Sequence, residues 1–193
     1  GRLTGADSGK GRLPEPGEIF DTARDVLARA AEANVLDLAG RHVVVTAGGT
    51  REDLDPVRFL GNRSSGLQGY ALARTAVARG ATVTLVSANV SLPDPAGVKV
   101  VRVVTTAEMR DAVLAAAGSA DAVVMAAAPA DFRPTTTATS KIKKSEDGST
   151  PAVHLTQNPD ILAEVARERP HPGAVVVGFA AETGDDSGSV LEH

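Results

Sequence analysis

Four short runs rich in valine recur along this chain of 193 residues, and each of them ends in small or polar residues. They are HVVVTAGG from His42, ATVTLVSA from Ala81, DAVVMAAA from Asp121 and AVVVGFAA from Ala174. Runs of this kind are typical of strands buried on both faces, and their alternation with helical segments predicts a parallel sheet. The sequence therefore predicts an α/β fold, namely a doubly wound, mostly parallel Rossmann-like sheet with helices on both faces.

Apolar spacing and capping signals predict helices around these strands. We expect them over residues 18–38, 66–79, 107–117 and 159–169, the last entered through Asn158 with Pro159 in its first position. A minor strand is expected at VKVVRV, residues 98–103. Residues 1–17 are rich in glycine, proline and charge, which predicts a linker or arm. A last helix that stops in its first turn predicts a C-terminally incomplete domain.

Composition and charge exclude several classes of function. Without cysteine, this sequence forms no disulfide, thiolate zinc site or cysteine nucleophile. A net charge of −4 gives no basic footprint for nucleic acid, and the longest apolar runs are too short to span a bilayer. The four histidines are scattered without ligand spacing, so the ligands of any metal stay unknown. We expect no nucleic-acid or membrane partner and a cytoplasmic location.

Two glycine-containing segments suggest a phosphate-binding site. They comprise Gly48 and Gly49 at the end of the first strand and, after an insertion, Ser64, Ser65, Gly66 and Gly69 at the start of a helix. Free N–H groups at a helix N-terminus favour anions, and glycine lets a phosphate approach the backbone. The alternative is that the serines cap the helix and the glycines allow close packing. We favour phosphate binding, because ligands bind such sheets at the carboxyl ends of the strands.

The insertion and the third run supply polar side chains at the same edge. Arg58 can clamp a carboxylate or phosphate, and Asn62 can bond an acyl oxygen without ionising. After the third run, three alanines at 126–128 allow close approach of a ligand, and Asp131 offers a carboxylate. For each side chain taken singly, an ordinary loop or turn role is the alternative.

The second half of the chain adds further candidates. Lys141, Lys143 and Lys144 form a basic segment, which is either solvated surface or a flap over a triphosphate. Asn158 either only starts a helix or also offers an edge to a base or ribose. Phe179 either stacks on a nucleobase or packs in the core.

A nicotinamide cofactor is the alternative ligand for such a sheet. The G-x-G-x-x-G fingerprint is absent, and the second strand ends in Ser87, Ala88 and Asn89 without an acidic residue for the ribose. Tyr70 is followed four positions later by Arg74 rather than by the lysine of a short-chain dehydrogenase. A nicotinamide-dependent oxidoreductase is therefore the less favoured interpretation.

Six segments, in order, resemble phosphopantothenoylcysteine synthetase, the bacterial CTP-using type of the coenzyme A pathway. They are TAGGTREDLDPVRFLGNRSSGLQGYALA, VTLVSANVSLPDP, AAAPADFRP, KIKK, QNPDIL and VVGFAAET, within residues 40–184. In addition, GKGRLPEPGEI at residues 9–19 resembles the tail of a flavin-dependent decarboxylase. The resemblance implies a linker over residues 1–19 and a C-terminally incomplete CTP-binding ligase domain over residues 20–193.

The resemblance also implies a ligase reaction in two steps. The carboxylate of 4'-phosphopantothenate attacks the α-phosphate of CTP, which gives an acyl-cytidylate and pyrophosphate, and the amino group of cysteine then displaces CMP. Further implications are a homodimer and a fused decarboxylase domain, which alone would hold FMN. Mg²⁺ would arrive mainly with the nucleotide phosphates. Because the substrate carboxylate is the nucleophile, positioning and charge stabilisation suffice. A non-catalytic nucleotide-binding module is the remaining alternative.

By the same resemblance, Asn62 would hold the acyl-cytidylate, Arg58 would help to bind phosphopantothenate, and Lys141 would act in the second step. Ala127 and Ala128 would line the substrate site. Taken with the glycine segments, the expected nucleotide-binding residues are Gly48, Gly49, Ser64, Ser65, Gly66, Gly69, Ala126, Ala127, Asp131, Lys141, Asn158, Pro159, Asp160, Ile161 and Phe179.

Overall fold

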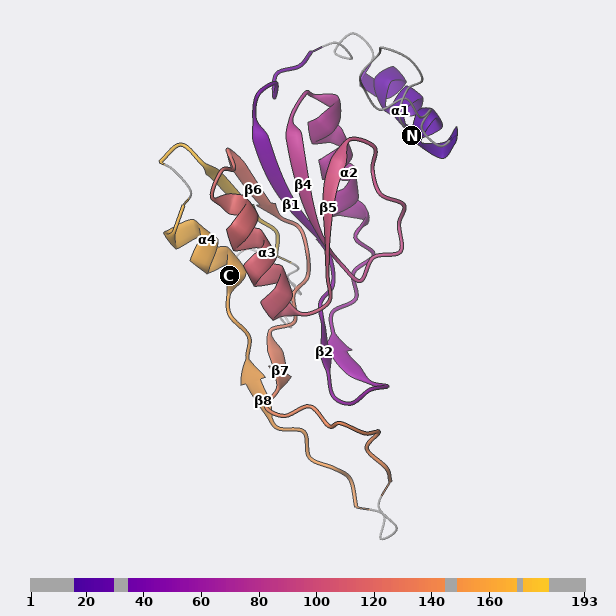
Figure 1. The fold of residues 1–193 in the computed structure, drawn as a ribbon, viewed down its shortest axis with the longest axis vertical. Coiled ribbons are helices and arrows are strands. Elements are labelled where there is room, and N and C mark those ends of the chain that lie inside the picture. The colour runs from indigo at the N-terminus through magenta and orange to yellow at the C-terminus, as the bar shows by residue number, and fades with distance from the viewer. Residues whose placement is uncertain (1–15, 30–34, 145–148, 170–171, 181–193) are drawn as a thin grey trace, which may run out of the picture.

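A five-stranded parallel sheet forms the centre of the computed structural model, which describes residues 16–29, 35–144, 149–169 and 172–180 (Figure 1). The strand order is β5-β4-β1-β6-β9, and every neighbouring pair is parallel. The strands are β1 (His42–Gly48), β4 (Thr82–Ala88), β5 (Val98–Val103), β6 (Ala122–Met125) and β9 (Val175–Gly178). The predicted α/β class and parallel sheet are confirmed, including the strand at residues 98–103.

The strand order places a topological switch point beside β1. From β1 the chain runs outward through β4 to β5, and it then returns to the other side of β1 to form β6 and β9. The register pairs Gly48 with Ala88, and Thr46 with Met125, so these strands end close to one level. In open α/β sheets, ligands bind in the crevice outside the carboxyl ends of the strands at such a switch point.

Helices cover both faces of the sheet, as predicted. On one face, α2 (Leu67–Ala78) contributes Tyr70 to a core with Val45 and Leu85. On the other face, α3 (Thr106–Ala117) and α4 (Ile161–Arg167) pack against the opposite sides of the same strands (Figure 1). Alternate side chains of β1 are buried in the two cores, which explains its continuous apolar sequence.

Two of the predicted helices have different bounds in the structure. The first, α1 (Pro16–Arg29), starts two residues early, and residues 35–38 do not continue it, so the prediction was wrong for those four residues. The fourth is not capped by Asn158. Asp160 is its N-cap and accepts a hydrogen bond from Ala163 N at 2.9 Å, since the side chain of Asn158 is buried elsewhere.

The other two helices lie where the sequence predicted them. Thr105 caps α3 in a capping box with Glu108. At α2 the N-cap is Gly66, in the left-handed conformation with φ of 77°, rather than a serine. Of the predicted linker over residues 1–19, residues 1–15 lie outside the described residues and the remainder starts α1. The predicted incomplete helix, within residues 181–193, also lies outside them.

Two antiparallel hairpins extend from the carboxyl end of the sheet, at the bottom of Figure 1. The insertion after β1 forms β2 (Arg51–Asp53) and β3 (Phe59–Gly61), and the second hairpin pairs β7 (Phe132–Pro134) with β8 (Leu155–Gln157). The sequence analysis did not predict either hairpin. Among the described residues, no helix has the length and apolar character needed to cross a membrane.

Gly69 allows α2 to approach β1 closely. A Cβ atom at this position would lie 2.6 Å from both Ala47 Cβ and Thr46 O. We therefore expect Gly69→Ala to lower the free energy of unfolding by about 1–3 kcal/mol, although alanine favours helices. Urea unfolding would measure the change. Gly118→Ala is the control, since nothing lies within 4 Å of its Cβ position, and equal stability of both variants would contradict the prediction.

Candidate functional site

The loops after β1 and β6 pair with each other at the switch point. Ala128 N donates to Gly48 O at 2.8 Å, and a parallel bridge joins Gly49 to Ala128. Ala127 N donates to the Thr46 hydroxyl at 3.0 Å. The glycine end of β1 and the loop of residues 126–129, here called the alanine loop, therefore lie side by side, and the sequence had assigned both to one site.

Asn62 is held against this paired edge. Its Nδ2 donates to Pro129 O at 2.8 Å, so the side chain spans from the first hairpin to the alanine loop. The backbone approaches closely here, because a Cβ at Gly49 would lie only 2.5 Å from Asn62 O. The structure thus brings together Asn62, Ala127 and Ala128, three of the four residues expected to form the substrate site, whereas Arg58 lies in the turn of the hairpin.

The two glycine segments are also adjacent. Gly48 and Gly66 both have left-handed backbone, and a Cβ at Gly66 would lie 3.4 Å from Gly48 N. A Cβ at Gly49 would be 3.6 Å from Ser64 Cβ. Ser65 Oγ accepts from Leu67 N at 3.4 Å and so lies at the start of α2. This arrangement gathers backbone groups and two hydroxyls at the N-terminus of a helix, where anions bind favourably.

Arg58 lies in the turn of the first hairpin and is bonded to Asp55, whose side chain is fully buried. Its Nε donates to Asp55 Oδ2 at 3.0 Å, and its Nη2 donates to Asp55 Oδ2 and to Ile142 O, the latter at 2.9 Å. The Arg58 guanidinium, together with N–H groups of Val57 and Ile142, holds the pKa of the Asp55 carboxyl well below its usual range. Arg58 therefore contacts the basic segment beside Lys141.

A buried polar network lies beneath these loops, and the sequence analysis missed it. The Thr50 and Thr106 hydroxyls are 2.8 Å apart, and Ala130 N donates to Thr50 Oγ1 at 2.8 Å. Asn158 Nδ2 donates to Ala130 O at 2.8 Å and to Thr106 Oγ1 at 3.3 Å. Glu52, also buried, accepts from Thr106 N at 2.8 Å. The signal in the sequence was the spacing of Thr50 and Glu52, which places both on one side of an extended segment.

The network determines the position of several predicted nucleotide-binding residues. The Asn158 side chain is buried in it and accepts from Arg133 Nη1 at 2.9 Å. Ile161 is buried in the core. The side chain of Asp131 is exposed, and its backbone carbonyl accepts a hydrogen bond from Asn158 N at 2.8 Å. Phe179 follows β9 with 48% of its surface exposed, so it is not the core residue of the alternative interpretation.

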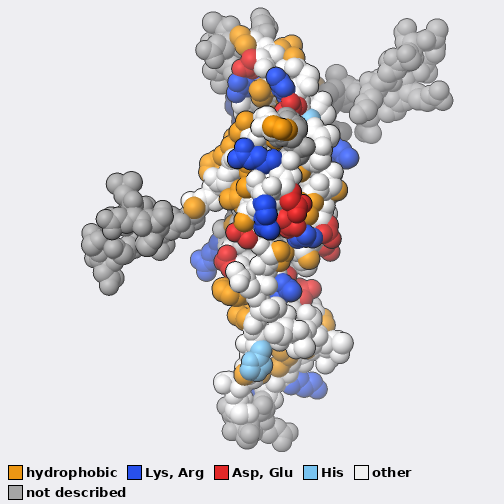
Figure 2. Space-filling view, turned by 90° about the vertical axis from the view of Figure 1, so that its left-hand side faces the viewer, with side chains coloured by type: hydrophobic (Ala, Val, Ile, Leu, Met, Phe, Trp, Pro, Cys, Tyr) orange, Lys and Arg blue, Asp and Glu red, His pale blue; other side chains and the backbone are white. Residues whose placement is uncertain are grey.

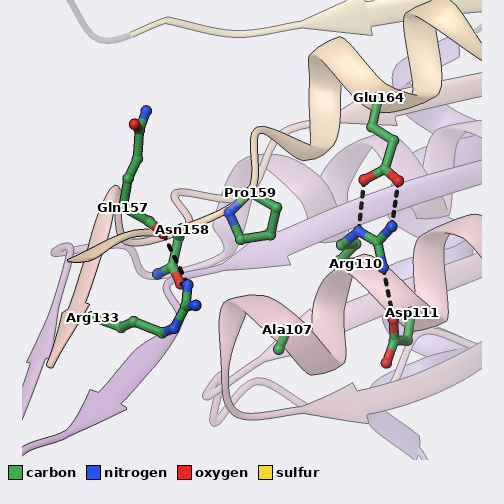
Figure 3. A pocket seen from close by; sticks show the side chains of 8 residues that line it. All are labelled: Ala107, Arg110, Asp111, Arg133, Gln157, Asn158, Pro159 and Glu164. Atoms are coloured by element: carbon green, nitrogen blue, oxygen red, sulfur yellow. Dashed lines mark hydrogen bonds and ion pairs between the residues drawn. The ribbon is translucent and has the colours of Figure 1, made fainter. Parts of the chain in front are cut away.

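An open groove of about 850 Å³ lies beside the Asn158 loop, between α3, α4 and the second hairpin (Figure 3). Pro159 lines it, and Arg110 on one wall forms a bidentate ion pair with Glu164 and a longer contact to Asp111 at 3.3 Å. Arg133 on the other side donates to Gln157 O and to Asn158. Arg110 and Arg133 both donate hydrogen bonds to protein acceptors, so the groove is a poorer phosphate site than the glycine segments.

No cluster of three or more His, Cys, Asp or Glu side chains suited to a metal ion occurs in the described part of the chain. On the face drawn in Figure 2, basic and acidic side chains are interspersed rather than gathered by sign. The donor set at the switch point consists instead of backbone N–H groups, hydroxyls and one amide. Such a set can bind phosphates and orient a reacting carboxyl group by hydrogen bonds.

We expect Thr106→Val to lower the free energy of unfolding by about 1–3 kcal/mol, because it removes a buried hydroxyl from Thr50 and Asn158 without changing the shape of the side chain. Urea unfolding would measure this loss. Thr75→Val is the matched control, because the Thr75 hydroxyl is exposed and, among the described residues, donates only to Ala71 O in its own helix. Equal free energies of unfolding for the two variants would contradict the role of the network in joining the loops.

Comparison with known proteins places this geometry in a family. The family model for the "DNA/pantothenate metabolism flavoprotein C-terminal domain" matches residues 38–191. The chain is 57% identical over 198 residues to the coenzyme A biosynthesis bifunctional protein CoaBC of Mycobacterium tuberculosis, and 46% identical over 186 residues to that of Bacillus subtilis. These alignments cover 100% and 96% of this chain but only 47% and 43% of the relatives, so the chain spans about half their length.

Solved structures agree with the sequence comparisons. The crystal structure of a CoaBC C-terminal domain superimposes with a TM-score of 0.65 at 37% identity, covering 78% of this chain and 69% of that one. A structure of Cab2 mutant H337A in complex with phosphopantothenate-cysteine shares the fold at 20% identity, with a TM-score of 0.61 and coverage of 90% and 74%. The chain belongs to the family of DNA/pantothenate metabolism flavoprotein C-terminal domains, and it matches the C-terminal domain of the bifunctional protein CoaBC.

Proposed function

We propose that this chain is the ligase part of a coenzyme A biosynthesis protein. It activates 4'-phosphopantothenate with CTP to give an acyl-cytidylate and pyrophosphate, and it then couples the acyl group to the amino group of cysteine. The products are 4'-phosphopantothenoylcysteine and CMP. The observation that carries the proposal is the position of Asn62, which is bonded to the alanine loop at the switch point, beside the glycine segments.

The chemistry of the site supports a reaction of this type. Acyl activation by a nucleotide needs anion-binding groups for the phosphates and a donor for the acyl oxygen, and it needs no enzyme nucleophile. The glycine segments and serines supply the first kind of group, and the Asn62 amide supplies the second. The relatives named for coenzyme A biosynthesis support the pathway, and the Cab2 complex supports the ligand class for this fold.

In this proposal, Arg58 and Asn62 bind the phosphopantothenate side, and Lys141 assists the second step. The cytidine portion lies toward the loop of residues 158–161 and toward Phe179. Because the described residues hold no carboxylate cluster, they fit Mg²⁺ that is bound mainly through the phosphates of CTP. FMN would belong to a fused decarboxylase domain and not to this chain.

Variants of two predicted site residues test the proposal. In the full-length protein with CTP, Mg²⁺, 4'-phosphopantothenate and cysteine, we expect release of pyrophosphate and CMP. Asn62→Asp should lower acyl-cytidylate formation by about 100-fold or more, because it replaces an amide donor by an anion next to anionic substrates. Lys141→Gln should instead let the acyl-cytidylate accumulate. Chromatography of the nucleotides would separate the two outcomes.

Lys99→Gln removes the charge of an exposed lysine and serves as the control, and the turnover of this variant should equal that of the wild type. Normal turnover of both site variants would contradict the residue assignment. If the wild-type protein released neither pyrophosphate nor CMP, the proposed ligase activity would be contradicted. In that case, binding of NADPH without CTP would favour the oxidoreductase alternative, and CTP binding without turnover would favour a nucleotide-binding module.

We further propose that the protein is a homodimer that associates through the hairpins. Large apolar side chains on and beside them are exposed, namely Val57, Phe59, Phe132, Val153 and Leu155. Exposed apolar patches of this kind often mark protein interfaces. At the lower end in Figure 2, orange hydrophobic side chains lie among mostly white surface, with some Lys and Arg side chains.

Leu155→Ser should shift the full-length protein toward the monomer, with the dimer dissociation constant raised about tenfold or more, since it removes apolar surface from the interface. Sedimentation equilibrium would measure the shift. Leu67→Ser, at an exposed leucine outside both hairpins, should leave the dimer unchanged. A wild-type protein that is monomeric at micromolar concentration, or equal effects of both variants, would contradict the proposed interface.

A further inference from the structure

The backbone of Ile142 is held at both of its polar groups by one ion pair. Ile142 N donates to Asp55 Oδ2 at 3.1 Å, and Ile142 O accepts from Arg58 Nη2 at 2.9 Å. Ile142 is the second residue of the basic segment, so Lys141 and Lys143 flank the point of attachment. The ion pair itself lies in the turn of the first hairpin, 84 to 87 residues earlier in the chain.

The chain before Ile142 follows the same turn. Thr137 Oγ1 donates to Asp53 O at 3.1 Å, and Ala138 N donates to Leu54 O at 3.0 Å. Residues 137–142 are therefore attached at three successive points to residues 53–58. Asn62 lies at the other end of the same hairpin, after β3, so the hairpin connects the basic segment to the predicted acyl site.

The two oxygens of Asp55 have different functions. Oδ1 accepts from Val57 N at 2.8 Å and from Arg58 N at 2.9 Å, which closes the turn locally. Oδ2 accepts from the Arg58 guanidinium, a local ion pair, and from Ile142 N in the distant segment. Burial of a carboxylate is unfavourable unless it is paired and hydrogen-bonded. The turn and its ion pair are complete without Ile142, so the further bond from Ile142 N to Oδ2 indicates a role in attachment of the basic segment.

We propose that Asp55 is a positioning residue that, through Arg58 and Ile142, fixes the basic segment to the turn of the first hairpin and so determines from where Lys141 can reach the acyl site. The catalytic part of this inference rests on the proposed ligase function, whereas the attachment does not. Asp55 touches no reacting atom in this scheme and acts only through the backbone of residue 142. Sequence analysis assigned no role to Asp55.

Hydrogen exchange tests the attachment without reference to activity. In the full-length protein, Asp55→Asn should speed exchange of the Ile142 amide by about tenfold or more, because its main acceptor loses its charge. Asp53→Asn is the matched control, as it changes an exposed aspartate of the same hairpin, and it should leave this amide as in the wild type. Unchanged exchange at Ile142 in folded Asp55→Asn would overturn the proposal.

A double-mutant cycle with Lys141 tests the positioning role. We expect Asp55→Asn to lower kcat for amide formation by about tenfold or more with little change in KM for CTP, and by less than about twofold in the Lys141→Gln background. An equal loss in both backgrounds would overturn positioning, since a general loss of stability does not depend on Lys141. If the wild type is not a ligase, the proposed function fails and the exchange experiment alone decides the attachment.

A second variant keeps the inference testable if Asp55→Asn does not fold. Ile142→Pro removes the N–H donor to Asp55 and fixes the local backbone, but it leaves Asp55, Arg58 and the turn unchanged. It should speed exchange of the Ala138 amide about tenfold, because the neighbouring attachment point is weakened, whereas Ile142→Ala retains the N–H and should not. Slow exchange of Ala138 in the proline variant would overturn the attachment.

Discussion

The pair of buried hydroxyls at Thr50 and Thr106 is the contact on which the geometry of the site depends. It joins the loop after β1 to the N-terminus of α3, and Ala130 and Asn158 attach the loops after β6 and β8 to the same pair. A buried hydroxyl without a partner costs about 1–3 kcal/mol, so no one of these loops can shift without a loss at the others. The loops at the carboxyl end of the sheet are therefore positioned as one unit.

The polar side chains near the site fall into two groups, according to whether they point into the protein or lie along the edge of the sheet. Asn158, Glu52 and Asp55 direct their side chains into the protein and hold backbone groups of other loops. Asn62, by contrast, extends along the edge where the glycine segments and the alanine loop meet. A site built in this way presents its donors in fixed directions before a ligand arrives, which is the arrangement that stabilises charge developing in a reaction.

The sequence predicted the sheet and the switch point because long apolar runs and helix caps are local signals. It did not predict the hairpins, since β2, β3, β7 and β8 are three residues each and lack a periodic apolar pattern. Reliance on local signals also led to the wrong cap for α4, at Asn158 instead of Asp160. Both Asn158 and Asp160 suit an N-cap locally, and only the buried network, which spans three loops distant in sequence, assigns Asn158 to another function.

Arg58 is a second residue whose contacts could not be predicted from local sequence, in this case at the site itself. From sequence, an arginine in a loop is a candidate for binding an anionic substrate, and nothing local shows that Asp55 is fully buried beside it. The ion pair leaves this turn close to neutral, so that it neither repels phosphates nor binds them strongly by charge. The same pair also bonds both backbone polar groups of Ile142, which lies between Lys141 and Lys143 of the basic segment. Arg58 can thus be essential to the reaction through the segment that it holds as well as through the substrate.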